Sequence, residues 1–252
     1  MKTIDFNKYT ELKEEKLSRL EIANYFEIPE WKLKRIISEN GWGKKAPLIG
    51  NLSAFNSYNE ESCYWAGFLA ADGNVDRKGR IRLMLNYDDI LHLEKFKTYL
   101  KSTHKVSSNT STYNRCSFEF TNKQMCNALT DNFNIVPEKS LVIQFPSLIS
   151  RDMIKHFIRG YFDGDGSVCE SFSNKNSITA TLYATFVGGS YDFIQHIFTY
   201  FSNTLGTVGH LQDFGTGKKW QIKYNTNDAK LVLSYMYENS KIYLDRKYSL
   251  YN

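Results

Sequence analysis

The feature that most constrains this chain is a segment that occurs twice. Residues 62–73 (SCYWAGFLAADG) and 155–166 (KHFIRGYFDGDG) both end in Asp-Gly, and each is followed by one residue and a valine. Further stretches that follow the two copies also resemble each other: 88–100 and 191–201, 118–129 and 222–233, and 137–141 and 245–250. A repeat of this kind predicts two halves of similar fold, related by a pseudo-twofold axis.

Each half contains the elements of an α+β fold. Residues 75–85 predict a β-hairpin with Gly79 in its turn, because apolar residues alternate along its second strand. Residues 177–187 predict strand structure in the second half. Together with the helical stretches, each half has the order helix–strand–strand–helix–strand–strand–helix. We place the halves at residues 61–148 and 149–252.

Small residues mark one face of each repeated segment. Gly160 and Gly164 are four positions apart, which places them on the same face of a helix, and the first copy has a comparable set (Ala66, Gly67, Ala70 and Ala71). Small side chains allow two helices to approach more closely than the usual ~8–10 Å between axes. We therefore expect the two segments to pack together and join the halves. Their bulky residues would then face each half's own core: Trp65, Phe68, Leu69, Tyr161 and Phe162.

Asp72 and Asp165 end these two helices, and we expect each following glycine to be a left-handed cap. A carboxylate at a helix C-terminus is unfavourable by ~0.3–1 kcal/mol, and packing the helices together adds repulsion between the two acids. A divalent cation such as Mg²⁺ would remove both penalties. Two acids with bound metal suit attack of activated water on a phosphodiester.

Two other interpretations of the acidic glycine segments are weaker. An EF-hand calcium loop needs a third acid and a later glutamate, and Ser167 and Glu170 do not fit that pattern. A plain Asp-Gly turn explains one copy well. It does not explain two copies that share the preceding small residues.

The N-terminal residues 1–43 predict a helix-turn-helix domain. Ser18 and Glu21 have the spacing of a capping box, and Pro29 separates the first helix from the second. Glu27 lies in the turn, where such motifs favour glycine, so we expect a strained or unusual turn. An ordinary helical hairpin would show the same periodicity. Residues 44–60 are polar, contain proline and glycine, and predict a linker.

Composition and charge indicate the kind of partner and the cellular location. A net charge of +5 and a pI near 8.8 permit an anionic partner. The apolar run at residues 62–71 is too short to span a bilayer, and the first residues mix acids and bases, unlike a secretory signal. The cysteines form no CxxC pair, so we expect reduced thiols that act as small apolar residues. These features predict a cytoplasmic protein with no membrane partner.

The segments WAGFLAADG (65–73) and IRGYFDGDG (158–166) resemble the paired signature of the LAGLIDADG homing endonucleases, in the single-chain form with two motifs. The resemblance covers about residues 61–252. It implies two αββαββα halves that form a saddle, with curved antiparallel sheets along the major groove of double-stranded DNA. It also implies that Asp72 and Asp165 are catalytic residues and metal ligands, in a monomer.

Two further residues gain a role from this resemblance. Asp163 matches an earlier acid of the signature, but Ala70 occupies that position in the first copy, so we expect Asp163 to be structural or solvent-facing. The family places a basic residue near the metals on a late strand. Lys223 fits this place as a catalytic group that stabilises charge or orients water, whereas its first-half counterpart is Glu119. An ordinary surface lysine is the alternative.

Exposed cations supply candidate DNA contacts. Those of the helix-turn-helix domain are Lys32, Lys34 and Arg35, and those of the halves are Arg77, Arg80, Arg82, Arg115, Lys175, Lys218 and Lys219. Any of them is also consistent with a phosphate contact or a solvated residue.

The sequence thus predicts a site-specific, Mg²⁺-dependent DNA endonuclease that cuts both strands at a long site, as expected of a mobile genetic element. The chain lacks the N-terminal nucleophile and terminal His-Asn of inteins, so we expect a free-standing enzyme. An RNA-splicing maturase and a non-cleaving DNA-binding regulator are the alternatives on the same fold. Retention of both acids favours cleavage.

Overall fold

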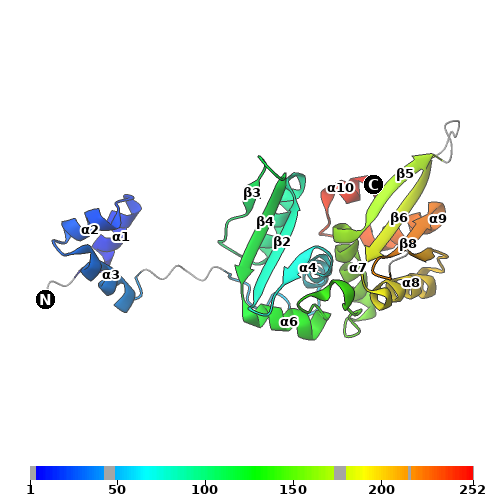
Figure 1. Ribbon diagram of the computed structural model, residues 1–252, viewed down its shortest axis with the longest axis horizontal. Coiled ribbons are helices and arrows are strands. Elements are labelled where there is room, and N and C mark those ends of the chain that lie inside the picture. The colour runs from blue at the N-terminus through cyan, green and yellow to red at the C-terminus, as the bar shows by residue number, and fades with distance from the viewer. Residues whose placement is uncertain (1–3, 43–48, 173–179, 215–216, 252) are drawn as a thin grey trace. The chain divides into compact units, whose positions relative to one another are not determined.

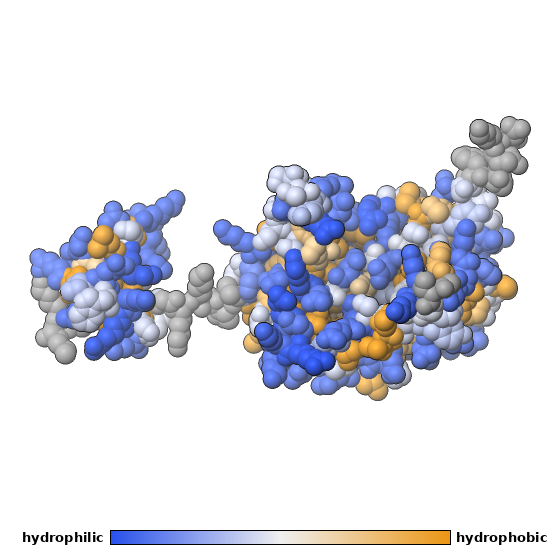
Figure 2. Space-filling view, viewed as in Figure 1, coloured by the Kyte–Doolittle hydropathy of each residue, from blue (hydrophilic) through white to orange (hydrophobic). Residues whose placement is uncertain are grey.

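The structure, a computed structural model, describes residues 4–42, 49–172, 180–214 and 217–251. The chain forms two compact units, Met1–Leu48 and Ile49–Asn252 (Figure 1). In the part of the chain described, no helix combines the length and the apolar character that a membrane span requires. Hydrophilic residues cover most of the visible face of the second unit (Figure 2).

The first unit contains α1 (Phe6–Glu14), α2 (Arg19–Tyr25) and α3 (Glu30–Glu39) around a small apolar core. The predicted capping box is present, because Ser18 accepts from the Glu21 N–H and the Glu21 side chain accepts from the Ser18 N–H. Pro29 is the N-cap residue of α3. Glu27 has φ +53° in the turn between α2 and α3, a left-handed conformation that costs a residue other than glycine about 1 kcal/mol. The expected strain at this turn is therefore present.

The first half of the second unit begins with α4 (Glu60–Ala71) and continues through β1 (Gly73–Val75), β2 (Arg80–Asn86), α5 (Ile90–Tyr99), β3 (Ser107–Asn109), β4 (Arg115–Thr121) and α6 (Lys123–Phe133). Short 3-10 helices follow β2 and α6, at Tyr87–Asp89 and Lys139–Leu141. The strands form an antiparallel sheet in the order β1-β2-β4-β3.

The second half repeats this order with α7 (Arg151–Asp165), β5 (Ser167–Phe172), β6 (Ala180–Gly188), α8 (Tyr191–Leu205), β7 (His210–Asp213), β8 (Trp220–Asn225) and α9 (Thr226–Tyr237), and then adds α10 (Asp245–Tyr251). Its antiparallel sheet has the matching order β5-β6-β8-β7. The αββαββα plan predicted for both halves is confirmed.

The strand register shows which residues of the two halves correspond. In the first sheet, Asn74 pairs with Arg82 and Arg82 with Glu119. In the second sheet, Ser167 pairs with Thr185 and Thr185 with Lys223. Asn74 and Ser167 each lie two residues after the aspartate of their half. Glu119 and Lys223 are therefore equivalent positions, as the sequence predicted.

The predicted linker is too long at its C-terminal end. The second unit begins at Ile49, and Phe55 is fully buried in its core, where the ring packs edge-on against Tyr99 and Phe133. The backbone carbonyl of Phe55 accepts a 2.9 Å hydrogen bond from the Asn132 side chain. Residues 49–59 therefore belong to the first half. This mostly polar segment is anchored by two aromatic side chains, Phe55 and Tyr58, both of which pack against Phe133.

Candidate active site where two helices meet

Helices α4 and α7 touch through their backbones. A Cβ atom added at Gly67 would lie 2.0 Å from the carbonyl oxygen of Phe157, and one at Gly160 would lie 1.9 Å from the carbonyl oxygen of Tyr64. Real Cβ atoms do not approach so closely, so only glycine fits at these two positions. The predicted packing of the repeated segments is confirmed, and the small residues are its cause.

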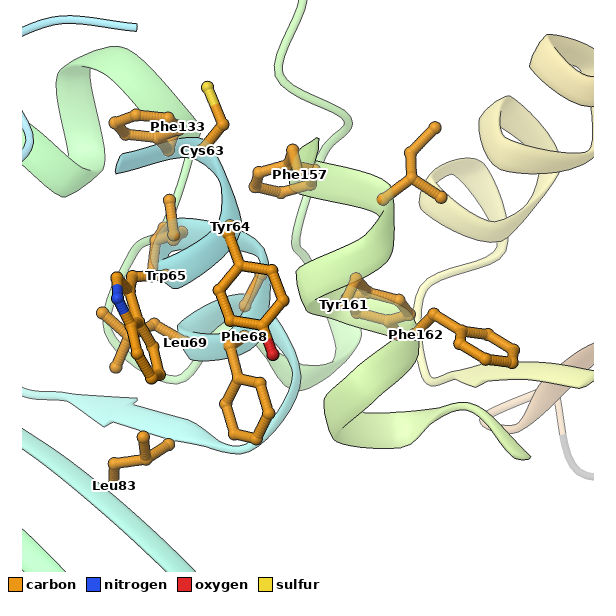
Figure 3. Close-up of a cluster of buried hydrophobic side chains, with 14 of the residues drawn as sticks. Cys63, Tyr64, Trp65, Phe68, Leu69, Leu83, Phe133, Phe157, Tyr161 and Phe162 are labelled. Atoms are coloured by element: carbon orange, nitrogen blue, oxygen red, sulfur yellow. The ribbon is translucent and has the colours of Figure 1, made fainter. Parts of the chain in front are cut away.

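The large side chains of the two helices fill the core of their own half (Figure 3). Trp65 and Leu69 lie on the side of α4 away from α7, and Phe162 lies on the side of α7 away from α4. All three are fully buried. This division fixes the rotation of each helix, and thereby the direction in which its last residues point.

Asp72 is the C-cap residue of α4 and Asp165 is the last residue of α7. Both residues keep part of their surface open to water, which screens their repulsion in part. Burial among the surrounding groups and the negative charge of Asp165 nevertheless raise the pKa of Asp72 to about 6. Burial also raises the pKa of Asp165, while Lys139 and Lys247 oppose that shift. The end of α7 lies beside Asp72, since a Cβ added at Gly164 would be 3.4 Å from the Asp72 Oδ2.

The glycines after the two acids have a different role from the predicted one. Gly166 has φ −80° and ψ 171°, which is extended backbone rather than a left-handed cap, and Gly73 starts a strand without a positive φ. A Cβ at Gly73 would lie 2.5 Å from the Leu69 carbonyl oxygen, and one at Gly166 would lie 2.4 Å from the Phe162 ring. The chain turns back so sharply from helix to strand that no side chain fits.

Two buried lysines close the C-terminal ends of these helices. Lys139 is 7% exposed and donates to the carbonyl oxygens of Ala71 and Gly73, the latter at 2.7 Å. Lys247 is 3% exposed and donates to a set of carbonyl oxygens at the end of α7: Phe162, Asp163, Gly164 and Gly166. A cation at this end of a helix compensates the negative end of the dipole.

These lysines are the functional candidates that the sequence reasoning missed. Burial lowers the pKa of Lys247 to about 8, whereas the charges of Asp163, Asp72 and Asp165 raise it in part. Burial likewise lowers the pKa of Lys139, against the charges of Asp165 and Asp72. The signal was present in the correspondence of residues 137–141 with 245–250, in which a lysine recurs.

Lys223 lies elsewhere, on the exposed face of β8, with its ammonium 3.9 Å from the centre of the Tyr183 ring. Lys223 pairs with Thr185 of β6, and Thr185 pairs with Ser167 of β5. The backbones of Lys223 and Ser167 are therefore two strand spacings, or ~10 Å, apart. The positive charges that lower the pKa of Asp165 are Lys139 and Lys247. A catalytic role for Lys223 stays a prediction.

Asp163 is fully buried, so the solvent-facing alternative was wrong and the structural one holds. Its carboxylate accepts from the Tyr64 hydroxyl at 2.7 Å, from the Tyr237 hydroxyl and from the Leu244 N–H at 2.8 Å. Burial raises the pKa of Asp163, and these hydrogen bonds lower it in part. Asp163 thereby ties α7 to both α4 and the C-terminal segment.

A cleft of about 480 Å³ opens beside one of the two acids. Asp72 lines it together with Asp89, Arg115 and Arg246. The Arg246 guanidinium is paired with the Asp89 carboxylate at 3.0 Å, and its charge lowers the pKa of Asp72. The cleft therefore gives solvent access to the Asp72 carboxylate next to the Arg246 guanidinium.

The donor set fits a hard divalent cation that completes its coordination with substrate. The described residues contain no group of three or more His, Cys, Asp or Glu side chains arranged to hold a metal. Mg²⁺ is commonly bound by one or two carboxylates together with substrate phosphates and water. Asp72 and Asp165, whose charges are held close together, provide such a pair.

The predicted DNA-contacting cations occupy three settings. Arg80, Arg82 and Arg115 lie on the outer face of the first sheet, and Lys219 lies just before β8, with Lys218 exposed beside it. Arg77 is 82% exposed in the β1–β2 turn, 3.9 Å from Glu138. On α3, Lys34 and Arg35 are exposed and Lys32 is half-buried. Lys175 lies outside the described residues.

The chain has the fold of the LAGLIDADG homing endonucleases, as the resemblance predicted. The structure of I-LtrWI, a LAGLIDADG homing endonuclease bound to target DNA, matches with a TM-score of 0.55 and 11% identity, over 79% of this chain and 88% of that one. I-SmaMI bound to cleaved DNA matches with a TM-score of 0.55 and 14% identity, over 77% and 87%. I-GzeII in complex with its DNA target matches with 0.54 and 14%, over 77% and 88%.

Sequence comparison adds less. No family model matches the chain. The replication factor C small subunit of Methanocaldococcus jannaschii is 25% identical over 119 residues. This match covers 45% of the chain and only 6% of that relative.

Proposed function

We propose that this protein is a site-specific endonuclease that hydrolyses phosphodiesters in both strands of duplex DNA and requires Mg²⁺ or a similar divalent metal. The observation that carries this proposal is the pair Asp72 and Asp165, held at the adjoining ends of two helices that touch backbone to backbone. The fold shared with DNA-bound homing endonucleases supports it.

Each group at the helix junction has a distinct task in this reaction. A divalent metal, when bound, would supply polarisation of the phosphate and activation of water. Asp72 and Asp165 would hold it, and a bound cation would offset the burial and the Asp165 charge that raise the pKa of Asp72. Lys139 and Lys247 keep positive charge beside the site, where negative charge develops on the phosphate oxygens. We keep Lys223 as a second basic candidate, on the outer face of the sheet.

The two sheets would bind the DNA. Their exposed strand positions carry Arg80, Arg82, Arg115 and Lys223, and strands of this kind fit the major groove. Because one chain supplies both halves and both acids, we propose that a monomer makes both cuts, and that the two sheets together engage a long site.

The first unit would add DNA affinity as a helix-turn-helix domain. Lys34 and Arg35 are exposed on α3, and Trp31, which is 64% exposed, lies on the same face one turn earlier. These residues would enter the major groove or contact phosphates. An RNA-splicing maturase and a non-cleaving regulator remain the alternatives that experiment must separate.

The test uses the full chain with random or genomic duplex DNA, in Mg²⁺ and in EDTA. We expect double-strand breaks at one long site in Mg²⁺ and none in EDTA. Tight, specific binding without breaks in Mg²⁺ would replace the endonuclease with the regulator. Preferential binding of structured RNA, again without DNA breaks, would favour the maturase.

A further inference from the structure

The outer faces of the two sheets differ at equivalent positions. In the first sheet, Arg82 and Glu119 are cross-strand partners. The equivalent residues of the second sheet are Thr185 and Lys223, and Thr185 is only 5% exposed. A charged pair in one half thus corresponds to a single lysine in the other.

The Arg82–Glu119 pair is positioned for contact with a partner molecule. The Arg82 Nε lies 3.5 Å from Glu119 Oε2, and the side chains are 39% and 42% exposed. Arg80 approaches the other oxygen of the same carboxylate at 3.8 Å. A hollow of about 280 Å³ opens on this face, lined by Arg82, Arg115 and Ser117 among others. The sheet therefore offers several guanidinium donors and one carboxylate acceptor at its surface.

The second sheet carries two amides, Gln212 and Gln221, at the positions that correspond to Ser107 and Ser117 of the first sheet. Gln212 donates from Nε2 to the Gln221 Oε1 at 2.7 Å, and Gln221 is the cross-strand partner of Val187 on β6. These three side chains form a row on the same face as Lys223 and are half-buried. The sequence contains no arginine between Arg159 and Arg246, which spans all four strands.

Major-groove chemistry distinguishes these two surfaces. Arginine binds O6 and N7 of guanine through two hydrogen bonds, and glutamate accepts from the N4 amine of cytosine. Glutamine binds N6 and N7 of adenine, and an aliphatic side chain contacts the methyl group of thymine. The Arg82–Glu119 pair therefore matches a G·C pair, and the Gln212–Gln221 pair matches an A·T pair, whereas Lys223 beside it has the chemistry to bind guanine.

We propose that Arg82 and Glu119 specify G·C base pairs in the half of the DNA target bound by the first sheet, and that Gln212 and Gln221 specify A·T pairs in the other half. This inference rests on the proposed function. It names the base pairs that these four residues select in each half-site.

The experiment is a selection from randomised duplex DNA with the full chain. Bound duplexes are recovered in EDTA, and cut duplexes are sequenced in Mg²⁺. The variants are Arg82→Gln and Glu119→Gln for the first sheet and Gln221→Ala for the second. Arg77→Gln is the control, because Arg77 is exposed in a turn and would contact phosphate only. Thermal melting confirms that each variant folds.

We expect Arg82→Gln to reduce the preference for guanine at one or two positions of one half-site by ~5–150-fold. Glu119→Gln should relax the same or the adjacent pair, and Gln221→Ala should relax an A·T pair in the opposite half-site. Arg77→Gln should weaken binding to all sequences alike.

Two outcomes would overturn the inference, and they differ. A selected site whose base preferences do not change in Arg82→Gln and Glu119→Gln refutes the assignment and leaves the endonuclease intact. If no duplex is enriched in either arm, the proposed function fails and the inference fails with it.

Discussion

Replacing Gly160 with alanine should separate the two acids. The added Cβ would lie 1.9 Å from the Tyr64 carbonyl oxygen and 2.8 Å from the Phe68 backbone nitrogen. Carbon and carbonyl oxygen normally approach to about 3.3 Å, so α4 and α7 must move apart by about 1.4 Å at this point. Both atoms that meet the methyl group belong to backbone, so no side-chain rotation can relieve the contact.

The expected cost has two parts. Overpacking typically costs ~1–3 kcal/mol, while alanine gains about 1 kcal/mol over glycine in a helix, which leaves a net loss of about 0–2 kcal/mol in the free energy of unfolding. The acids lie at the ends of the same two helices, and a displacement of about 1 Å at reacting groups lowers rates by ~100-fold. The rate of DNA cleavage should therefore fall strongly, while the free energy of unfolding changes little.

Urea unfolding and single-turnover DNA cleavage measure these two effects on the same preparation. The control is Asn203→Ala on α8, an exposed helical position, and it should leave both values near wild type. A Gly160→Ala protein that cuts DNA at the wild-type rate would refute the claim that helix contact sets the geometry of the site.

The other predictions concern charge. Because the pKa of Asp72 is raised to about 6, Mn²⁺ affinity of the DNA-free protein should weaken as the pH falls through 6, which titration calorimetry will detect. Because its pKa is higher in the folded protein than in the unfolded chain, protonated Asp72 favours folding. This contribution to the free energy of unfolding is complete below pH ~4 and is lost as the pH rises through about 6. Asp72→Asn, after allowance for solvent screening, should therefore gain about 1 kcal/mol at pH 7 in urea unfolding; a loss would contradict this. Lys247→Met should lower the free energy of unfolding by ~2–4 kcal/mol, because several buried carbonyl groups lose their donor; unchanged urea unfolding would refute the capping role. Lys34→Ala with Arg35→Ala should weaken DNA binding and reduce the slope of log affinity against log salt by ~1.8, and an unchanged slope would exclude phosphate contacts by α3.

The contact between α4 and α7 could be predicted because the segment that forms it occurs twice in the sequence. Two Asp-Gly segments with preceding small residues indicated close packing, and Gly67 and Gly160 do lie against backbone of the facing helix. The capping box at Ser18 was equally local, since its spacing alone determines the hydrogen bonds. Features encoded by an internal repeat or by a short local spacing could therefore be predicted from the sequence.

The remaining features depend on distant contacts. Lys139 and Lys247 lie in polar stretches that resemble surface, and only the tertiary fold reveals that helix-end carbonyls surround them. Asp163 is buried because Tyr64 and Tyr237, far apart in sequence, converge on it. The tight path after Asp165 likewise depends on where the Phe162 ring lies.

The central claim is that Asp72 and Asp165 form one metal-dependent site for DNA hydrolysis. The most direct test compares wild type with the Asp72→Asn/Asp165→Asn double variant on the duplex selected by the wild-type protein, in Mg²⁺, with strand-specific labels. We expect the wild type to cut both strands at one position, and the double variant to bind that duplex without cutting either strand. Strand cleavage by the double variant at the wild-type rate would contradict the claim.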